Sequence, residues 1–78
     1  MTPKVGEVLH LGEDLAEDIR AGLWCVMAIR WGGITELKRV GIDEDGHLSV
    51  TYRCITVTRQ QRDNFIPVGF NIFEEERE

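Results

Sequence analysis

The nine residues Leu-Trp-Cys-Val-Met-Ala-Ile-Arg-Trp at positions 23–31 decide the fold. This run is rich in residues that favour extended backbone, and it is apolar at both odd and even positions. A strand that is apolar on both sides is usually covered above and below, so residues 23–31 predict a central strand. A helix that continues from residue 13 to Ile29 is the competing interpretation, because apolar residues also recur every four positions. We prefer the strand because Gly22 interrupts that pattern.

Upstream of this run, residues 5–11 predict a first strand that Gly12 closes. Residues 13–21 have the content of one or two helical turns. Acidic residues stand in the first turn, and Leu15 and Ile19 are four residues apart. Gly22 then supplies the stop. This is the short helix that we expect.

Downstream, Gly32 and Gly33 predict a turn that leads into a strand over residues 34–42. The acidic turn at residues 43–46 is a strong hairpin signal, and residues 47–58 form a long β-branched return strand. The apolar residues change face within this return strand, since Leu48, Val50 and Tyr52 alternate on one face and Ile55 and Val57 on the other. A bulge or bend near Arg53 would account for the change.

The last part of the chain predicts one more strand. Residues 59–64 are polar and read as a loop, and residues 65–73 are apolar, with Pro67 indicating an edge position. The expected fold is therefore mostly β (α+β): a small curved antiparallel sheet or partly open barrel of about five strands with one short helix. We expect residues 1–73 to form one compact domain and residues 74–78 a frayed acidic tail.

The charge of the chain limits its function. Fourteen acidic residues stand against nine basic ones, which gives a net charge of −5. A nucleic-acid binder normally needs a basic patch, and the basic residues here are scattered, so we expect no direct contact with nucleic acid. An acidic surface can instead imitate nucleic acid toward a larger protein that is basic or nucleic-acid-associated. We find no signal-peptide pattern and no apolar run of about 18 residues, which predicts a cytoplasmic protein without membrane contact.

No pattern of residues indicates catalysis, a metal or a cofactor. His10, Cys25, His47 and Cys54 lack the close spacing of a zinc site. Both cysteines stand in apolar runs, so we expect them to be buried and inert. The acidic run at residues 43–45 lacks the other ligands of a calcium loop. The sequence therefore predicts a protein that is not an enzyme and holds no cofactor.

The candidate partner-binding residues are two tryptophans, two acidic clusters and two phenylalanines near the end. Trp24 and Trp31 have odd spacing on the predicted strand and so lie on opposite faces. Either both belong to the core, which the sequence favours, or one belongs to the core and the other is an exposed anchor for a partner. The full set is Trp24, Trp31, Glu13, Asp14, Glu17, Asp18, Asp43, Glu44, Asp45, Phe70 and Phe73.

Several short motifs resemble the C-terminal domain of LexA-type and phage CI-type repressors, a self-cleaving serine peptidase fold. They are the Gly6-Glu7 step that begins a strand, the Arg20-Ala21-Gly22-Leu23 turn, the Lys38-Arg39 pair and the Gly46–Val50 return strand. The resemblance covers roughly residues 6–50 and extends more loosely to residues 66–72. It implies that Lys38 stands where the family has its general base.

The departures from that family are informative. The family's nucleophilic serine precedes the Gly-Asp pair, whereas no serine precedes Gly6 here and the aspartate is replaced by Glu7. A lysine without a nucleophile cannot carry out the covalent step, so the resemblance implies a truncated, inactive relative. We therefore expect a small non-catalytic regulator or inhibitor that derives from a phage or prophage. It would occupy a surface of a repressor or defence protein, as an anti-repressor or anti-CRISPR protein does. The alternative is a structural subunit of a homo-oligomer, including a homodimer.

Overall fold

Strand β2 (Gly22–Ile29) is the central strand of a five-stranded sheet in the computed structural model of this protein, which describes residues 3–75. The other strands are β1 (Glu7–Leu11), β3 (Thr35–Ile42), β4 (Leu48–Val57) and β5 (Phe65–Asn71). The order across the sheet is β4-β3-β2-β1-β5, and every neighbouring pair is antiparallel. The prediction of a mostly β fold with about five antiparallel strands is confirmed.

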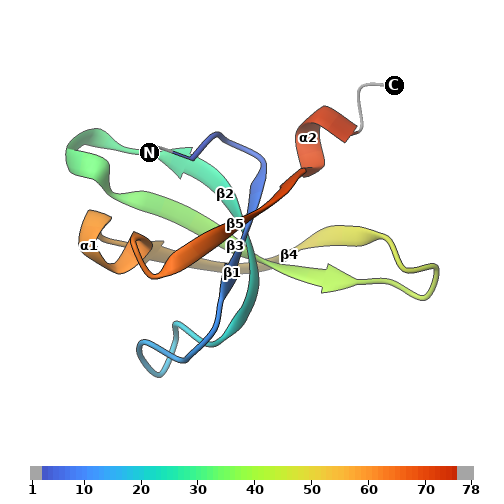
Figure 1. The fold of residues 1–78 in the computed structure, drawn as a ribbon, viewed down its shortest axis with the longest axis horizontal. Helices are drawn as coiled ribbons and strands as arrows, with labels where there is room; N and C mark the ends of the chain where they lie inside the picture. Colours follow the sequence, from blue (N-terminus) through green and yellow to red (C-terminus); the bar gives the residue numbers. More distant parts are fainter. Residues whose placement is uncertain (1–2, 76–78) are drawn as a thin grey trace.

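The sheet is open. Strands β4 and β5 are its two edges, and within residues 3–75 no strand pairing joins them. Three connections leave the sheet in different directions: the β1–β2 loop, the β2–β3 turn and the β3–β4 hairpin (Figure 1). The figure shows helix α1 (Arg59–Arg62) near the β2–β3 turn and helix α2 (Ile72–Glu75) near the end of the chain.

The hydrophobic core consists of two clusters on opposite faces of the sheet. Neighbouring residues of a strand point to opposite faces, so Trp24 and Cys25 of β2 belong to different clusters. The larger cluster contains Leu9, Leu11, Ile19, Trp24, Val26, Leu37, Ile55, Val57 and Phe65. The smaller one contains Val8, Cys25, Val40 and Ile72. Because β2 is buried on both faces, it has the doubly apolar sequence that predicted a central strand.

The predicted irregularity in β4 is confirmed. Lys38 of β3 pairs with Cys54, but Val40 pairs with Val50, so three residues of β4 face the single residue Arg39. This bulge spans residues 51–53. Leu48 and Val50 pack with the smaller cluster and Ile55 and Val57 with the larger one, as the alternation of side chains along a strand requires for residues an odd number of positions apart.

The predicted helix over residues 13–21 is wrong, and so is the longer helix to Ile29. Residues 12–21 form an irregular loop, in which the Leu15 amide donates to the Ile19 carbonyl at 2.8 Å. That direction is the reverse of a helical hydrogen bond, whose acceptor precedes its donor. Ile19 is buried in the larger cluster, whereas Leu15 is exposed. The four-residue spacing of Leu15 and Ile19 therefore does not mark the buried face of a helix, because only Ile19 packs in the core.

The two helices lie where none was predicted. The polar segment at residues 59–64, which we expected to be a loop, begins with α1, and a four-residue helix α2 follows β5. Helix α2 includes Glu74 and Glu75 of the predicted acidic tail, while residues 76–78 lie outside the described residues. In the described part of the chain, no helix has the length and apolar character that a membrane span requires.

Candidate functional site

Among the residues that the structure describes, Trp31 has the most exposed large apolar side chain, at 96% of its full accessible surface. It begins the short 3-10 turn Trp31–Gly33 between β2 and β3. Gly33 donates its amide to the Arg30 carbonyl at 3.1 Å, and Arg30 donates its amide to the Ile34 carbonyl at 2.6 Å. Both glycines of the turn have a positive φ, near +80°, which explains the Gly-Gly pair.

Helix α1 supports this turn from the side. The guanidinium of Arg62 donates to the Thr35 hydroxyl at 3.0 Å and to the Gly33 carbonyl at 3.4 Å. Arg30 also forms an ion pair with Glu36 across the end of the turn. The indole of Trp31 is therefore presented to solvent on a backbone that is fastened at several points, together with the exposed side chain of Ile34.

Trp24 is the tryptophan that belongs to the core, with 1% of its surface exposed. The favoured interpretation, in which both tryptophans belong to the core, is therefore wrong for Trp31, and the candidate Trp24 has almost no surface with which to contact a protein partner. Its indole Nε1 donates to the Arg20 carbonyl at 2.9 Å, and the guanidinium of Arg39 lies 5.0 Å from the centre of its ring. Trp24 thus supports the β1–β2 loop.

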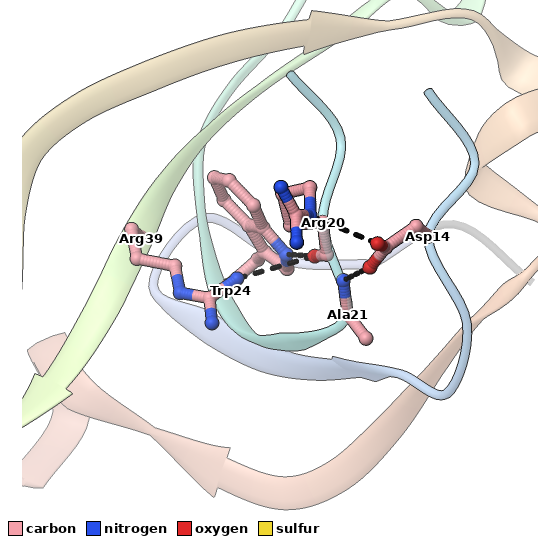
Figure 2. A network of polar contacts seen from close by, with 5 residues as sticks. All are labelled: Asp14, Arg20, Ala21, Trp24 and Arg39. Atoms are coloured by element: carbon pink, nitrogen blue, oxygen red, sulfur yellow. Dashed lines mark hydrogen bonds and ion pairs between the residues drawn. The ribbon is translucent and has the colours of Figure 1, made fainter. Parts of the chain in front are cut away.

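A polar network fastens that loop to the sheet (Figure 2). Asp14 accepts from the Ala21 amide at 2.7 Å and forms an ion pair with Arg20 at 2.8 Å. Arg39 donates to the Arg20 carbonyl at 3.1 Å. The Ala21 amide, followed by the charges of Arg20 and Arg39, holds the pKa of Asp14 below its ordinary value of 3.8. The loop contributes a carboxylate and a guanidinium that are both held in position.

Beside this network lies a surface hollow of about 540 Å³. Its lining consists of Asp14, Arg20, Ala21, Trp24, Arg39 and Arg53. No local pattern in the sequence indicates this hollow, because its three arginines come from the β1–β2 loop, from β3 and from the bulge of β4. They meet only through the strand register.

The predicted acidic clusters do not form one surface with Trp31. Glu13, Asp14, Glu17 and Asp18 are exposed on the β1–β2 loop, and Asp43, Glu44 and Asp45 are exposed at the β3–β4 hairpin. Figure 1 shows these two connections and the Trp31 turn pointing in three different directions. Of the predicted phenylalanines, Phe70 is half-buried against the smaller cluster and Phe73 is exposed. The candidate residues therefore define several separate surfaces.

The hairpin turn brings together three groups that could hold a metal ion. One ligand atom from each of Asp43, Asp45 and His47 lies within 4.8 Å of the others, and all three residues are exposed. The fold of the turn accounts for this arrangement, because Asp43 Oδ1 accepts from the amides of Asp45 at 2.9 Å and His47 at 2.8 Å. The hairpin turn that the sequence predicted at residues 43–46 is therefore present, and the side chain of Asp43 caps it.

The two cysteines and Lys38 lie in one row across the sheet, since Lys38 pairs with Cys25 on one side and Cys54 on the other. Both cysteines are free thiols. Cys25 is buried, and burial raises the pKa of its thiol to about 11. The expectation that both would be buried is wrong for Cys54, which is exposed because it lies on the edge strand β4. Ser49, the serine of this chain, pairs with Gly41, three residues along β3 from Lys38.

Comparison with known proteins finds no matching family model, no matching curated protein and no matching solved structure. The resemblance to the repressor peptidase domain therefore stays a prediction from the sequence.

Proposed function

We propose that this protein is a small non-catalytic binding domain that regulates or inhibits a larger protein. In this proposal Trp31 is the anchor that enters an apolar pocket of that protein. The observation that carries it is the nearly complete exposure of an indole on a turn that the rest of the fold holds in place.

An exposed tryptophan contributes nothing to the core, whereas its burial on binding can contribute a few kcal/mol. Tryptophan is enriched among the residues that dominate binding energy at interfaces. The turn is already fastened by Arg62 and by its own backbone hydrogen bonds, so little conformational freedom is lost on binding. Ile34 would add apolar contact beside the indole.

The net charge of −5 supports a basic or nucleic-acid-associated protein as the target. Acidic side chains on the β1–β2 loop and at the β3–β4 hairpin would speed the encounter by long-range attraction, while Trp31 supplies most of the affinity. We propose a repressor or a defence protein as the target, and an action like that of anti-repressor or anti-CRISPR proteins. The phage or prophage origin in this proposal rests on the repressor-like motifs and on analogy with small acidic phage proteins.

The test compares two variants that each remove an exposed aromatic side chain. Tagged protein is used to capture its target from an extract of the source cells, and the affinity for the purified target is then measured. We expect Trp31→Ala to weaken binding by about 30-fold, which corresponds to a hot spot of about 2 kcal/mol. Tyr52→Ala is the matched control, because Tyr52 is 95% exposed but lies on the bulge of β4. Equal binding by Trp31→Ala and the native protein would refute the role of Trp31 as an anchor. The absence of any stoichiometric target would refute the proposal that the protein regulates or inhibits a larger protein.

The second candidate function is a structural subunit of a homo-oligomer, and the edge strand β5 favours it. Only one side of β5 is paired, and its apolar side chains Ile66 and Val68 are 64% and 47% exposed. Such an edge can pair with a second copy. Sedimentation over a wide concentration range tests this function: Ile66→Lys should dissociate an oligomer, and a native protein that stays monomeric throughout would exclude it.

A further inference from the structure

The arginine-lined hollow beside the β1–β2 loop is positively charged on an otherwise acidic protein. Arg20, Arg39 and Arg53 line it together with one acidic residue, Asp14. Three arginines against one aspartate leave two positive charges in excess, although the whole chain carries −5. Like charges brought into one concavity repel each other, so this arrangement is favourable when an anion neutralises it.

Two of the three guanidinium groups are free to bind an anion. Asp14 pairs with Arg20 at 2.8 Å. Among the side chains that the structure describes, those of residues 3–74, no carboxylate forms an ion pair with Arg39 or Arg53. The bulge at residues 51–53 faces Arg39 across the β3–β4 pair, which explains why both free arginines border the same hollow.

Arg39 is held in place before any ligand arrives. Its guanidinium packs over the ring of Trp24, donates to the Arg20 carbonyl and lies directly against Gly22. A Cβ atom at position 22 would come within 2.3 Å of Arg39 Nη2, so the glycine makes room for the guanidinium. A fixed guanidinium loses less freedom on binding than a mobile one, and its planar fork matches two oxygens of a phosphate.

We propose that this hollow binds a phosphate monoester as the dianion. The two excess positive charges match a dianion, whereas a phosphodiester or a carboxylate would neutralise one of them. The volume of about 540 Å³ lies within the range of small-molecule sites and leaves room for an organic group on the phosphate. The site borders the β1–β2 loop, and its lining includes no residue of the Trp31 turn at the other end of β2, so it is independent of the proposed protein-binding function.

The test uses methyl phosphate and dimethyl phosphate with the full chain at about pH 8, where a monoester whose second pKa is about 6 is dianionic. Sodium chloride keeps the ionic strength equal. The ¹⁵N–¹H signal of the Trp24 indole reports binding, because this N–H donates into the network that holds Arg20 and Arg39. We expect a saturable shift with methyl phosphate and about tenfold weaker binding of dimethyl phosphate. A tenfold difference is what the loss of about one charge-assisted hydrogen bond produces.

Arg53→Gln should weaken the binding of methyl phosphate by about tenfold. Arg53 is exposed and forms no ion pair with a described residue, so the fold should tolerate this change. Arg59→Gln is the matched control, because Arg59 is an exposed arginine on α1 outside the hollow. Three results would overturn the proposal: no saturable shift, equal binding of the diester, or equal weakening by Arg59→Gln.

Discussion

The two cysteines share a row across the sheet but differ in their access to solvent. Cys25 lies on the central strand with no exposed surface, and burial raises the pKa of its thiol to about 11, so it stays protonated and shielded. Cys54 lies on the edge strand and is exposed. We therefore expect one equivalent of thiol to react with Ellman's reagent in the folded protein and two after denaturation.

Cys54→Ser provides the control for this assignment. It should abolish the reaction of the folded protein and leave one reactive thiol after denaturation. Two reactive thiols in the folded state would show that Cys25 is accessible and would contradict the central position of β2.

Acidification should loosen the β1–β2 loop through Asp14. The pKa of this carboxyl is lowered in the folded state, first by the Ala21 amide and then by Arg20. Its stabilising contribution is therefore fully present above the ordinary pKa of 3.8 and is lost as the pH falls through the lower, folded pKa. Hydrogen exchange or the chemical shift of the Ala21 amide, followed between about pH 6 and pH 2, measures the change.

Asp14→Asn should remove that pH dependence at Ala21, because an amide side chain does not titrate in this range. Glu17→Gln should preserve it, since Glu17 is an exposed acid of the same loop that forms no ion pair with a described residue. A titration of the Ala21 amide that persists in Asp14→Asn would assign the effect to another group.

The tryptophans show how far a single residue can be placed from sequence. Odd spacing predicts opposite faces only while a strand continues, and β2 ends at Ile29, two residues before Trp31. Trp31 is exposed because it begins a turn, so the interpretation that placed both tryptophans in the core fails at the end of the strand. Which tryptophan belongs to the core depended on the position of that strand end.

At the scale of elements, the capping box of α1 is the feature most open to test. The Thr58 hydroxyl accepts from the Gln61 amide at 3.1 Å, and Gln61 Oε1 accepts from the Thr58 amide at 2.9 Å. Thr58→Ala removes one of these bonds and should lower the free energy of unfolding by about 1 kcal/mol in urea denaturation. Gln60→Ala, an exposed change inside the same helix, should leave it within about 0.5 kcal/mol. Equal effects of the two changes would show that the cap is not what stabilises the helix.

The sequence of helix α1 contains a capping signal but no apolar periodicity. The segment Arg59–Arg62 has no apolar periodicity, so a hydrophobic pattern cannot reveal it. The Thr58-x-x-Gln61 spacing is a readable capping signal that would have placed its start. The β1–β2 loop is the opposite case, in which an apolar pattern predicted a helix that does not form. Leu15 and Ile19 have helical spacing, but the contacts of Asp14 with Ala21 and Arg20 hold the segment as a loop.

At the scale of the whole molecule, the strands and most turns could be predicted because each has a local cause. Apolar residues mark the strands, and the Asp43 turn closes the hairpin. The change of face in β4 reflects a strand that packs against both core clusters, and its bulge lies at the place where that change occurs. The arginine hollow could not be predicted, because Arg20, Arg39 and Arg53 are brought together only by the pairing of strands distant in sequence. Local patterns specify elements, whereas a site assembled across the sheet depends on their register.

The outward direction of the β3–β4 hairpin also determines how the molecule can be attached to a surface (Figure 1). Glu44 is exposed at its tip, and the hairpin begins four residues along the chain from Arg39, about 13 Å of extended strand. A Glu44→Cys change in a Cys54→Ser background would give one solvent-accessible thiol for immobilisation. The protein would then be held by the hairpin in a single orientation, with the indole and the arginines facing the solution.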